Sequence, residues 1–305
     1  MLSFEDEVRN DSEYFVIMNI DFVLKPHYSA KSKNNYDYYF ERRFQMKDYN
    51  TAINPLGSIA DPNVIIETIK YYNEYGLKAT KEEFVEGNAF GFDITSSRQR
   101  FFSVINKLLL KDSDNKAKKF FIKAVSSAKP NNSFKRSLIY LEAFRTNDLF
   151  ADITEHLVYK KYQENRKIIE SAEILEFLKD FGEDTKIIEW SESTLKIIGS
   201  KYNSFMKRIG FFKKEKRYKS LISFPYPDEK IITYLVYQLK MEGLSDNDIY
   251  DSNMFKALML TENQKVELLK KGSIAGFYDF NFSGAKNASF ELHYSREEII
   301  DVLFR

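Results

Sequence analysis

Short polar and basic side chains share one face of a predicted helix at residues 191–209, where they could contact a nucleic acid. Because successive helical residues are turned by about 100°, the opposite face collects the apolar residues Leu195, Ile198, Tyr202, Phe205 and Ile209. The polar face collects Ser193, Lys196, Ser200, Asn203 and Lys207. Short polar side chains reach base edges or phosphates, and lysines neutralise phosphates. We therefore predict that this helix enters the major groove of DNA; a face that is only solvated is the alternative.

A basic hairpin is predicted directly after this helix. The helix ends at Gly210, and a strand begins at Phe211. The segment KKEKR at 213–217 is predicted as a basic turn that leads into a second strand at 218–224. Together with a short helix at 171–182, this gives the order helix, helix, hairpin of a winged helix-turn-helix. The predicted DNA-binding residues are Ser191, Ser193, Thr194, Lys196, Ser200, Lys201, Asn203, Lys207, Arg208, Lys213, Lys214, Lys216, Arg217 and Lys219, with Arg98 and Arg100.

The outward face of the predicted helix offers few contacts that distinguish one base from another. It holds no arginine and only one asparagine, so bidentate contacts to base edges are scarce. We expect mainly phosphate contacts and weak sequence discrimination. If about six phosphates are neutralised, the affinity for DNA falls steeply with salt.

Positive charge is concentrated in two short segments of a nearly neutral chain. The 305 residues hold 46 lysines and arginines against 45 aspartates and glutamates, a net charge of +1. Residues 96–136 nonetheless carry 11 basic and 2 acidic side chains, and residues 196–219 carry 9 and 1. Such segregation is typical of a basic surface that binds nucleic acid. The first segment places Arg98 and Arg100 on a predicted amphipathic helix at 95–110, and whether the fold joins the two segments stays open.

Signatures of enzymes and of metal sites are scarce. The chain has no cysteine, which excludes disulfides, thiolate nucleophiles and iron–sulfur clusters. His27, His156 and His293 are dispersed, and neither a phosphate-binding glycine loop nor a nucleophile elbow occurs. Acidic clusters near predicted helix starts are more typical of caps than of catalytic carboxylates. We therefore predict no catalytic residue, no metal site and no cofactor.

The chain as a whole is predicted to be mainly α with small β-hairpins, an α+β fold. An acidic N-terminus and the lack of a long apolar stretch predict a cytoplasmic protein without a membrane partner. A second hairpin is predicted from two strands of alternating polarity at 277–282 and 288–294. This hairpin lacks a basic tip, so we give it a role in packing or in partner binding. The predicted parts are an N-terminal extension (1–50), a helical domain (51–165), a winged helix-turn-helix-like domain (166–226) and a second winged-helix-like domain (227–305).

Local signals fix some boundaries within these parts. Alternating apolar residues predict a strand at 16–24. Asp61 followed by proline predicts the start of a helix, and Gly76 its end. Thr80 with a glutamate three residues later predicts a capping box that opens another helix.

Four segments resemble the BrxA family of bacteriophage-exclusion (BREX) defence systems in their order and spacing. They are INPLGSIADPNVIIETI at 53–69, NAFGFDITSSRQRFFSVINKLL at 88–109, FKRSLIYLEAFRTNDLFADITEHLVYKKY at 134–162 and WSESTLKIIGSKYNSFMKRIGFF at 190–212. The last resembles the most characteristic block of the family: a tryptophan, a threonine, a basic helix, a glycine and a pair of large apolar residues. The resemblance covers about residues 51–225.

The resemblance implies a non-enzymatic component of a multi-gene phage-resistance system. The family resembles winged-helix DNA binders and has also been likened to RNA-binding antitermination factors. Its systems pair such a protein with a methyltransferase, an ATPase and a phosphatase-like protein, which are therefore expected partners. Carried over by position, the binding element is residues 191–208 with the hairpin 211–224, and no catalytic residue is transferred.

Three hypotheses about function follow. The leading one is a double-stranded DNA-binding accessory protein of a phage-defence system. An RNA-binding, antitermination-like factor would use the same basic helix on structured or single-stranded RNA. A protein–protein scaffold would instead rely on the acidic C-terminal hairpin and the abundant aromatic residues.

Overall fold

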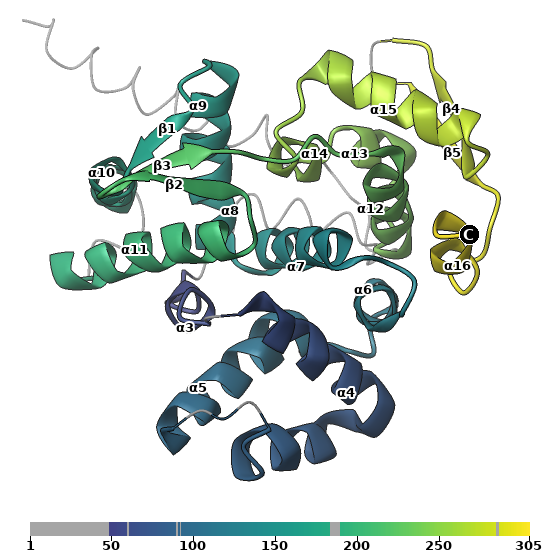
Figure 1. Ribbon diagram of the computed structural model, residues 1–305. Helices are drawn as coiled ribbons and strands as arrows, with labels where there is room; N and C mark the ends of the chain where they lie inside the picture. Colours follow the sequence, from purple (N-terminus) through teal and green to yellow (C-terminus); the bar gives the residue numbers. More distant parts are fainter. Residues whose placement is uncertain (1–48, 60, 90, 92, 184–189, 285–286) are drawn as a thin grey trace, which may run out of the picture. The chain divides into compact units, whose positions relative to one another are not determined.

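The computed structural model describes residues 49–59, 61–89, 91, 93–183, 190–284 and 287–305 (Figure 1). The chain divides into two compact units, Met1–Phe44 and Gln45–Arg305, and all the described elements belong to the second. The predicted strand at 16–24 and nearly all of the predicted extension lie outside the described residues. The described part is mainly helical with two small antiparallel sheets, which confirms the prediction of a mainly α fold with small β elements.

Helices form the first part of this unit, as predicted. Asp61 caps α4 because its carboxylate accepts a hydrogen bond from the Asn63 N–H at 2.8 Å, and Pro62 occupies the first helical position. Gly76 adopts φ 77° and ψ 177°, so α4 kinks there and then continues. The elements are α3 Ile53–Leu56, α4 Pro62–Lys81, η1 Glu82–Glu86, α5 Thr95–Ile105, η2 Asn106–Leu110, α6 Lys116–Ser126 and α7 Asn132–Thr146.

The predicted capping box at Thr80 is wrong. Thr80 lies inside α4, where it is fully buried, and its hydroxyl donates to the Gly76 carbonyl at 2.7 Å. The hydroxyl therefore bonds back to the backbone one turn earlier, and it does not cap a new helix.

A three-stranded antiparallel sheet lies in the middle of the chain, with strand order β1-β3-β2. Strand β1, which the sequence patterns did not predict, pairs Ile169 with Ser220 of β3. The predicted basic turn is corrected: most of KKEKR forms β2, and the turn is Arg217-Tyr218, where Tyr218 has φ 68°. The elements are α8 Asp148–Asp152, η3 Ile153–Tyr159, α9 Lys160–Gln163, β1 Ile168–Glu170, α10 Ser171–Glu183, α11 Glu192–Arg208, β2 Phe212–Lys216 and β3 Lys219–Ile222.

Helices and a second hairpin complete the chain. Strands β4 and β5 pair antiparallel, with Phe280 opposite Phe290, which confirms the predicted hairpin. One cluster of buried apolar residues includes side chains from α3 through to α16. The predicted domain boundaries within residues 51–305 stay predictions. The elements are α12 Glu229–Met241, α13 Asp246–Tyr250, α14 Met254–Ala257, α15 Glu262–Ile274, β4 Tyr278–Phe282, β5 Ala288–Leu292 and α16 Ile299–Leu303.

A buried carboxylate joins helices α6, α7 and α12. Glu142 on α7 has no exposed side-chain surface, and it pairs with Lys118 of α6 and with Arg145, whose Nε lies 2.9 Å from it. Gln238 of α12 donates to the same carboxylate at 3.3 Å. Burial alone would raise the pKa of Glu142, but the charges of Arg145 and Lys118 outweigh burial and hold that pKa below its usual 4.5. The carboxylate therefore stays charged at neutral pH.

We predict that Glu142→Gln destabilises the fold by about 3–5 kcal/mol. The change leaves the buried Lys118 without its carboxylate, and it leaves the half-buried Arg145 with only Glu242. The measurement is the midpoint of urea denaturation. The control is Glu67→Gln, which removes an exposed ion pair with Lys70 (2.7 Å) and should leave the midpoint unchanged. Equal midpoints for the two variants would show that the buried cluster does not hold the helices together.

Helix α3 packs against both α11 and α5 (Figure 1). The contact with α11 is a backbone contact: a Cβ atom added at Gly57 would lie 2.7 Å from Lys201 Cα and closer still to the Lys201 carbonyl oxygen. Arg208 of α11 donates to the carbonyls of Gly57, at 2.8 Å, and of Ile59. A glycine is therefore required where α3 meets α11.

We predict that Gly57→Ala destabilises the protein by about 1–3 kcal/mol, because the new methyl group meets backbone atoms that cannot rotate away. Thermal unfolding measures the effect. The neighbouring change Ser58→Ala, at an exposed position, should leave the melting temperature within the error of the wild type. An unchanged melting temperature for Gly57→Ala would contradict the close contact.

Candidate nucleic-acid interface

Helix α11 forms as its sequence pattern predicts. The Ser191 hydroxyl accepts a hydrogen bond from the Thr194 N–H at 3.3 Å and so caps the first turn. The same hydroxyl lies 2.8 Å from Ser193 Oγ and 3.0 Å from Thr194 Oγ1. The apolar face is buried against the core throughout, which confirms its predicted members Leu195, Ile198, Tyr202, Phe205 and Ile209.

The predicted outward face is correct except at Asn203. Ser193, Lys196 and Ser200 are exposed, and Lys207 is half-buried. Asn203 is only 5% exposed, and its Oδ1 accepts a hydrogen bond from the Ser220 hydroxyl of β3 at 2.8 Å. The prediction for Asn203 is wrong because the hairpin packs beside α11 and widens its buried face. Asn203 therefore holds the hairpin to the helix and cannot reach a ligand.

One flank of α11 is covered by α3. Lys201 and Arg208 lie on this flank and are half-buried, and the Arg208 guanidinium binds the carbonyls of the α3 segment. The exposed residues of α11 are confined to its first half, which ends at Ser200. The stretch from Ser191 to Ser200, about two and a half turns of helix, remains the accessible part.

The hairpin presents its predicted cations on β2, the edge strand of the sheet. Lys213, Lys214 and Lys216 are exposed, and Arg217 stacks its guanidinium 4.9 Å from the ring centre of exposed Tyr218. The Ser171 N–H donates to the Tyr218 carbonyl at 3.0 Å and so fixes the turn. Lys219 lies on β3 and is half-buried.

Helix α11 and strand β2 form one electropositive region. Burial lowers the pKa of Lys207, and the charge of nearby Lys214 lowers it further. Lys196 pairs with Glu192 at 2.6 Å, and Lys219 pairs with Glu170. By contrast, the following cations make no ion pair with any carboxylate in the described part of the chain: Lys201, Lys207, Lys213, Lys214, Lys216 and Arg217.

Not all cations of the other basic segment, residues 96–136, are available to extend this electropositive region. Lys118 is buried with Glu142, Lys123 donates to the Glu297 carbonyl at 2.7 Å, and Lys129 pairs with Asp301 at 3.1 Å. These side chains bind the core or the C-terminal part of the chain.

Arg98 and Arg100 lie on α5. Helix α5 packs against α3, and α3 also packs against α11. Arg98 is half-buried and donates to Thr95 Oγ1 at 2.6 Å, whereas Arg100 is exposed. The two predicted basic segments are therefore linked through α3.

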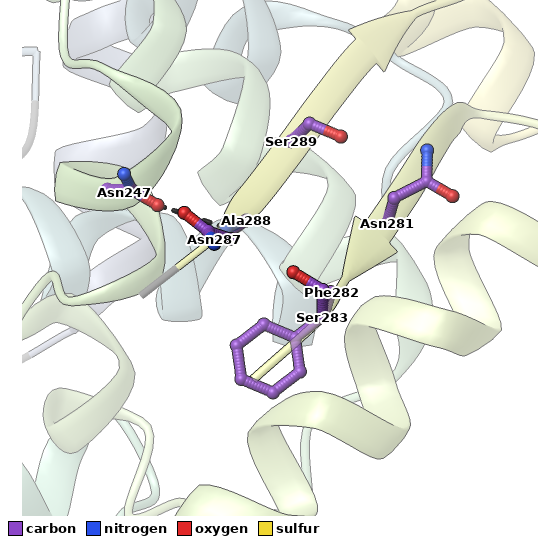
Figure 2. A pocket seen from close by; sticks show the side chains of 7 residues that line it. All are labelled: Asn247, Asn281, Phe282, Ser283, Asn287, Ala288 and Ser289. Atoms are coloured by element: carbon purple, nitrogen blue, oxygen red, sulfur yellow. Dashed lines mark hydrogen bonds between the residues drawn. The ribbon is translucent and has the colours of Figure 1, made fainter. Parts of the chain in front are cut away.

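The described residues offer little that could bind a metal or a charged small molecule elsewhere. They contain no cluster of metal-binding side chains and no helix long and apolar enough to cross a membrane. Figure 2 shows a pocket of about 480 Å³ beside the β4–β5 hairpin, where Asn247 Oδ1 accepts from the Ala288 N–H at 3.0 Å. Its lining is neutral, and no sequence pattern pointed to it: Asn247, Asn281, Phe282, Ser283, Asn287, Ala288 and Ser289.

Comparison with known proteins bears on this same part of the chain. The sequence model of the BrxA family matches residues 65–238, which extend from α4 to α12 and include α11 and both strands of the hairpin. No curated protein and no solved structure matches the chain. Because the family match covers more than half of the 305 residues, the protein belongs to the BrxA family, whose members are components of BREX phage-defence systems.

Proposed function

We propose that this protein is a non-enzymatic component of a BREX system that binds double-stranded DNA through α11 and the β2–β3 hairpin. Membership of the BrxA family supports the place in phage defence. One observation carries the DNA-binding part: Lys207 of α11 and the lysines of β2 make no ion pair with any carboxylate in the described part of the chain, and Lys207 lies near Lys214. A polyanion is the partner that neutralises such a group.

The topology around α11 supports a winged helix-turn-helix reading. The helical stretch of η3 and α9 is followed by β1, α10, α11, β2 and β3, which gives the order helix, strand, helix, helix, strand, strand. The sheet has the order β1-β3-β2. In this arrangement α11 takes the position of the recognition helix, and the hairpin is the wing. The short side chains of α11 suit close approach to the groove, and the β2 lysines suit the neighbouring phosphates.

The cover by α3 determines how DNA would lie. Since Lys201 and Arg208 face α3, the helix would enter the groove with the part that ends at Ser200. The only cation exposed on this part is Lys196, so most of the binding free energy would come from phosphates, with the lysines of β2 as the main contributors. Sequence discrimination would be correspondingly weak.

DNA fits this geometry better than duplex RNA. A helix with its side chains is about 10–12 Å across, which matches the major groove of B-form DNA at about 12 Å. The major groove of A-form RNA is too narrow for side chains to read. We further propose that other BREX components bind elsewhere on this protein. The β4–β5 hairpin is a candidate, because its strands carry Asp279 and Glu291 but no lysine or arginine.

We predict that replacing Lys213, Lys214, Lys216 and Arg217 together by alanine abolishes most binding to duplex DNA at low salt. The slope of log affinity against log salt should fall in magnitude by up to about 3.6, which corresponds to four phosphate contacts. The measurement is a fluorescence anisotropy titration of a labelled duplex at several salt concentrations.

The matched control removes four exposed lysines elsewhere, Lys78, Lys81, Lys270 and Lys271, and so changes the net charge equally. This control variant should bind like the wild type. Equal loss in both variants would show that only net charge matters. A preference of the wild type for single-stranded RNA would instead favour the RNA-binding hypothesis.

We predict that Glu192→Gln strengthens DNA binding by about fivefold, the effect of removing one unit charge close to a phosphate in water. The change also releases Lys179 and Lys196, which pair with Glu192 at 3.1 and 2.6 Å. The same titration measures the effect. Glu267→Gln, which breaks the similar exposed pair with Lys271 on α15, is the control and should leave the affinity unchanged. Weaker binding by Glu192→Gln would place DNA away from the start of α11.

A further inference from the structure

One apolar side chain interrupts the accessible part of α11. Ile197 is 45% exposed, whereas the other large apolar residues of this helix, Leu195, Ile198, Tyr202, Phe205 and Met206, are at most 6% exposed. Burial against the core therefore does not explain an isoleucine at this position. Its surroundings define what it can contact.

The neighbours of Ile197 are polar or basic. Ser193 and Ser200 lie one turn away on either side along the helix, and Lys196 precedes it. Lys201, one turn after Ile197, marks the point where α3 contacts the helix. Ile197 thus lies in the accessible part of α11, which would enter the groove.

The major groove of DNA contains one apolar group, the C5-methyl of thymine. Serine hydroxyls both donate and accept hydrogen bonds, so Ser193 and Ser200 cannot strongly distinguish one base from another. The aliphatic side chain of Ile197 can, because it gains from covering a methyl group and gains nothing from a polar base edge.

We propose that Ile197 contacts thymine methyl groups in the major groove and gives this protein a preference for sites with thymine. This inference rests on the proposed DNA binding by α11. It deepens that function by naming the base that the helix recognises and the residue that recognises it. The preference is modest, because one methyl contact is small beside several phosphate contacts.

The test compares two duplexes of the same sequence, one with thymine and one with deoxyuridine at every thymine position. Deoxyuridine pairs identically but lacks the C5-methyl. Wild-type protein should bind the thymine duplex about fourfold more tightly for each methyl that is covered, which corresponds to about 0.8 kcal/mol. Ile197→Ala should bind both duplexes alike and keep the salt dependence of the wild type.

The control variant is Ile274→Ala, which truncates an 86% exposed isoleucine on α15 and should keep the thymine preference. A second pair of duplexes, with cytosine or 5-methylcytosine, adds a methyl group without changing base pairing. The wild type should favour the methylated duplex, and Ile197→Ala should not.

The outcomes separate this inference from the proposed function. Tight, salt-dependent binding of the wild type to both duplexes with equal affinity would overturn the role of Ile197 and leave DNA binding intact. A thymine preference that persists in Ile197→Ala would overturn it as well. Failure of the wild type to bind either duplex at low salt would overturn the proposed function itself.

Discussion

The buried carboxylate of Glu142 is the constraint around which the helices of this protein are arranged. A charge removed from water is stable only when cations and donors of fixed position surround it, and here they come from α6, α7 and α12. The helix that carries Glu142 also carries Tyr140, whose ring centre lies 4.7 Å from that of Phe211 just before β2. Aromatic packing therefore fixes the start of the basic hairpin relative to α7.

Sequence reasoning succeeded where a short segment determines its own structure. The apolar face of α11, the Asp61 cap and the β4–β5 hairpin follow from spacing and capping chemistry that act within a few residues. It failed where distant segments meet. Asn203 has the helical spacing of an exposed residue, but the folded chain brings Ser220 of β3 against it, and Asn203 is buried. Spacing within the helix cannot show a contact with a strand.

The same limit applies to the rest of the site. Strand β1 has three residues and depends on pairing with β3, about fifty positions later in the chain, so no local period announces it. The contact of Gly57 with Lys201 and the exposure of Ile197 also depend on which parts of α11 its neighbours cover. The count of charges in each segment was misleading for a related reason. A count treats all lysines alike, but Lys118 is buried whereas the lysines of β2 are exposed.

Because α3 covers part of α11, the helix can contact only a short stretch of DNA sequence. The accessible part of α11, at about 1.5 Å per residue, is about 14 Å long, and DNA rises about 3.4 Å per base pair, so this part spans about four base pairs. Any four-base-pair word recurs by chance about once in 256 positions, which is far too frequent to mark one genomic address among the competing sites. Selective targeting would then have to come from several copies bound side by side or from partner proteins that read further along the same duplex.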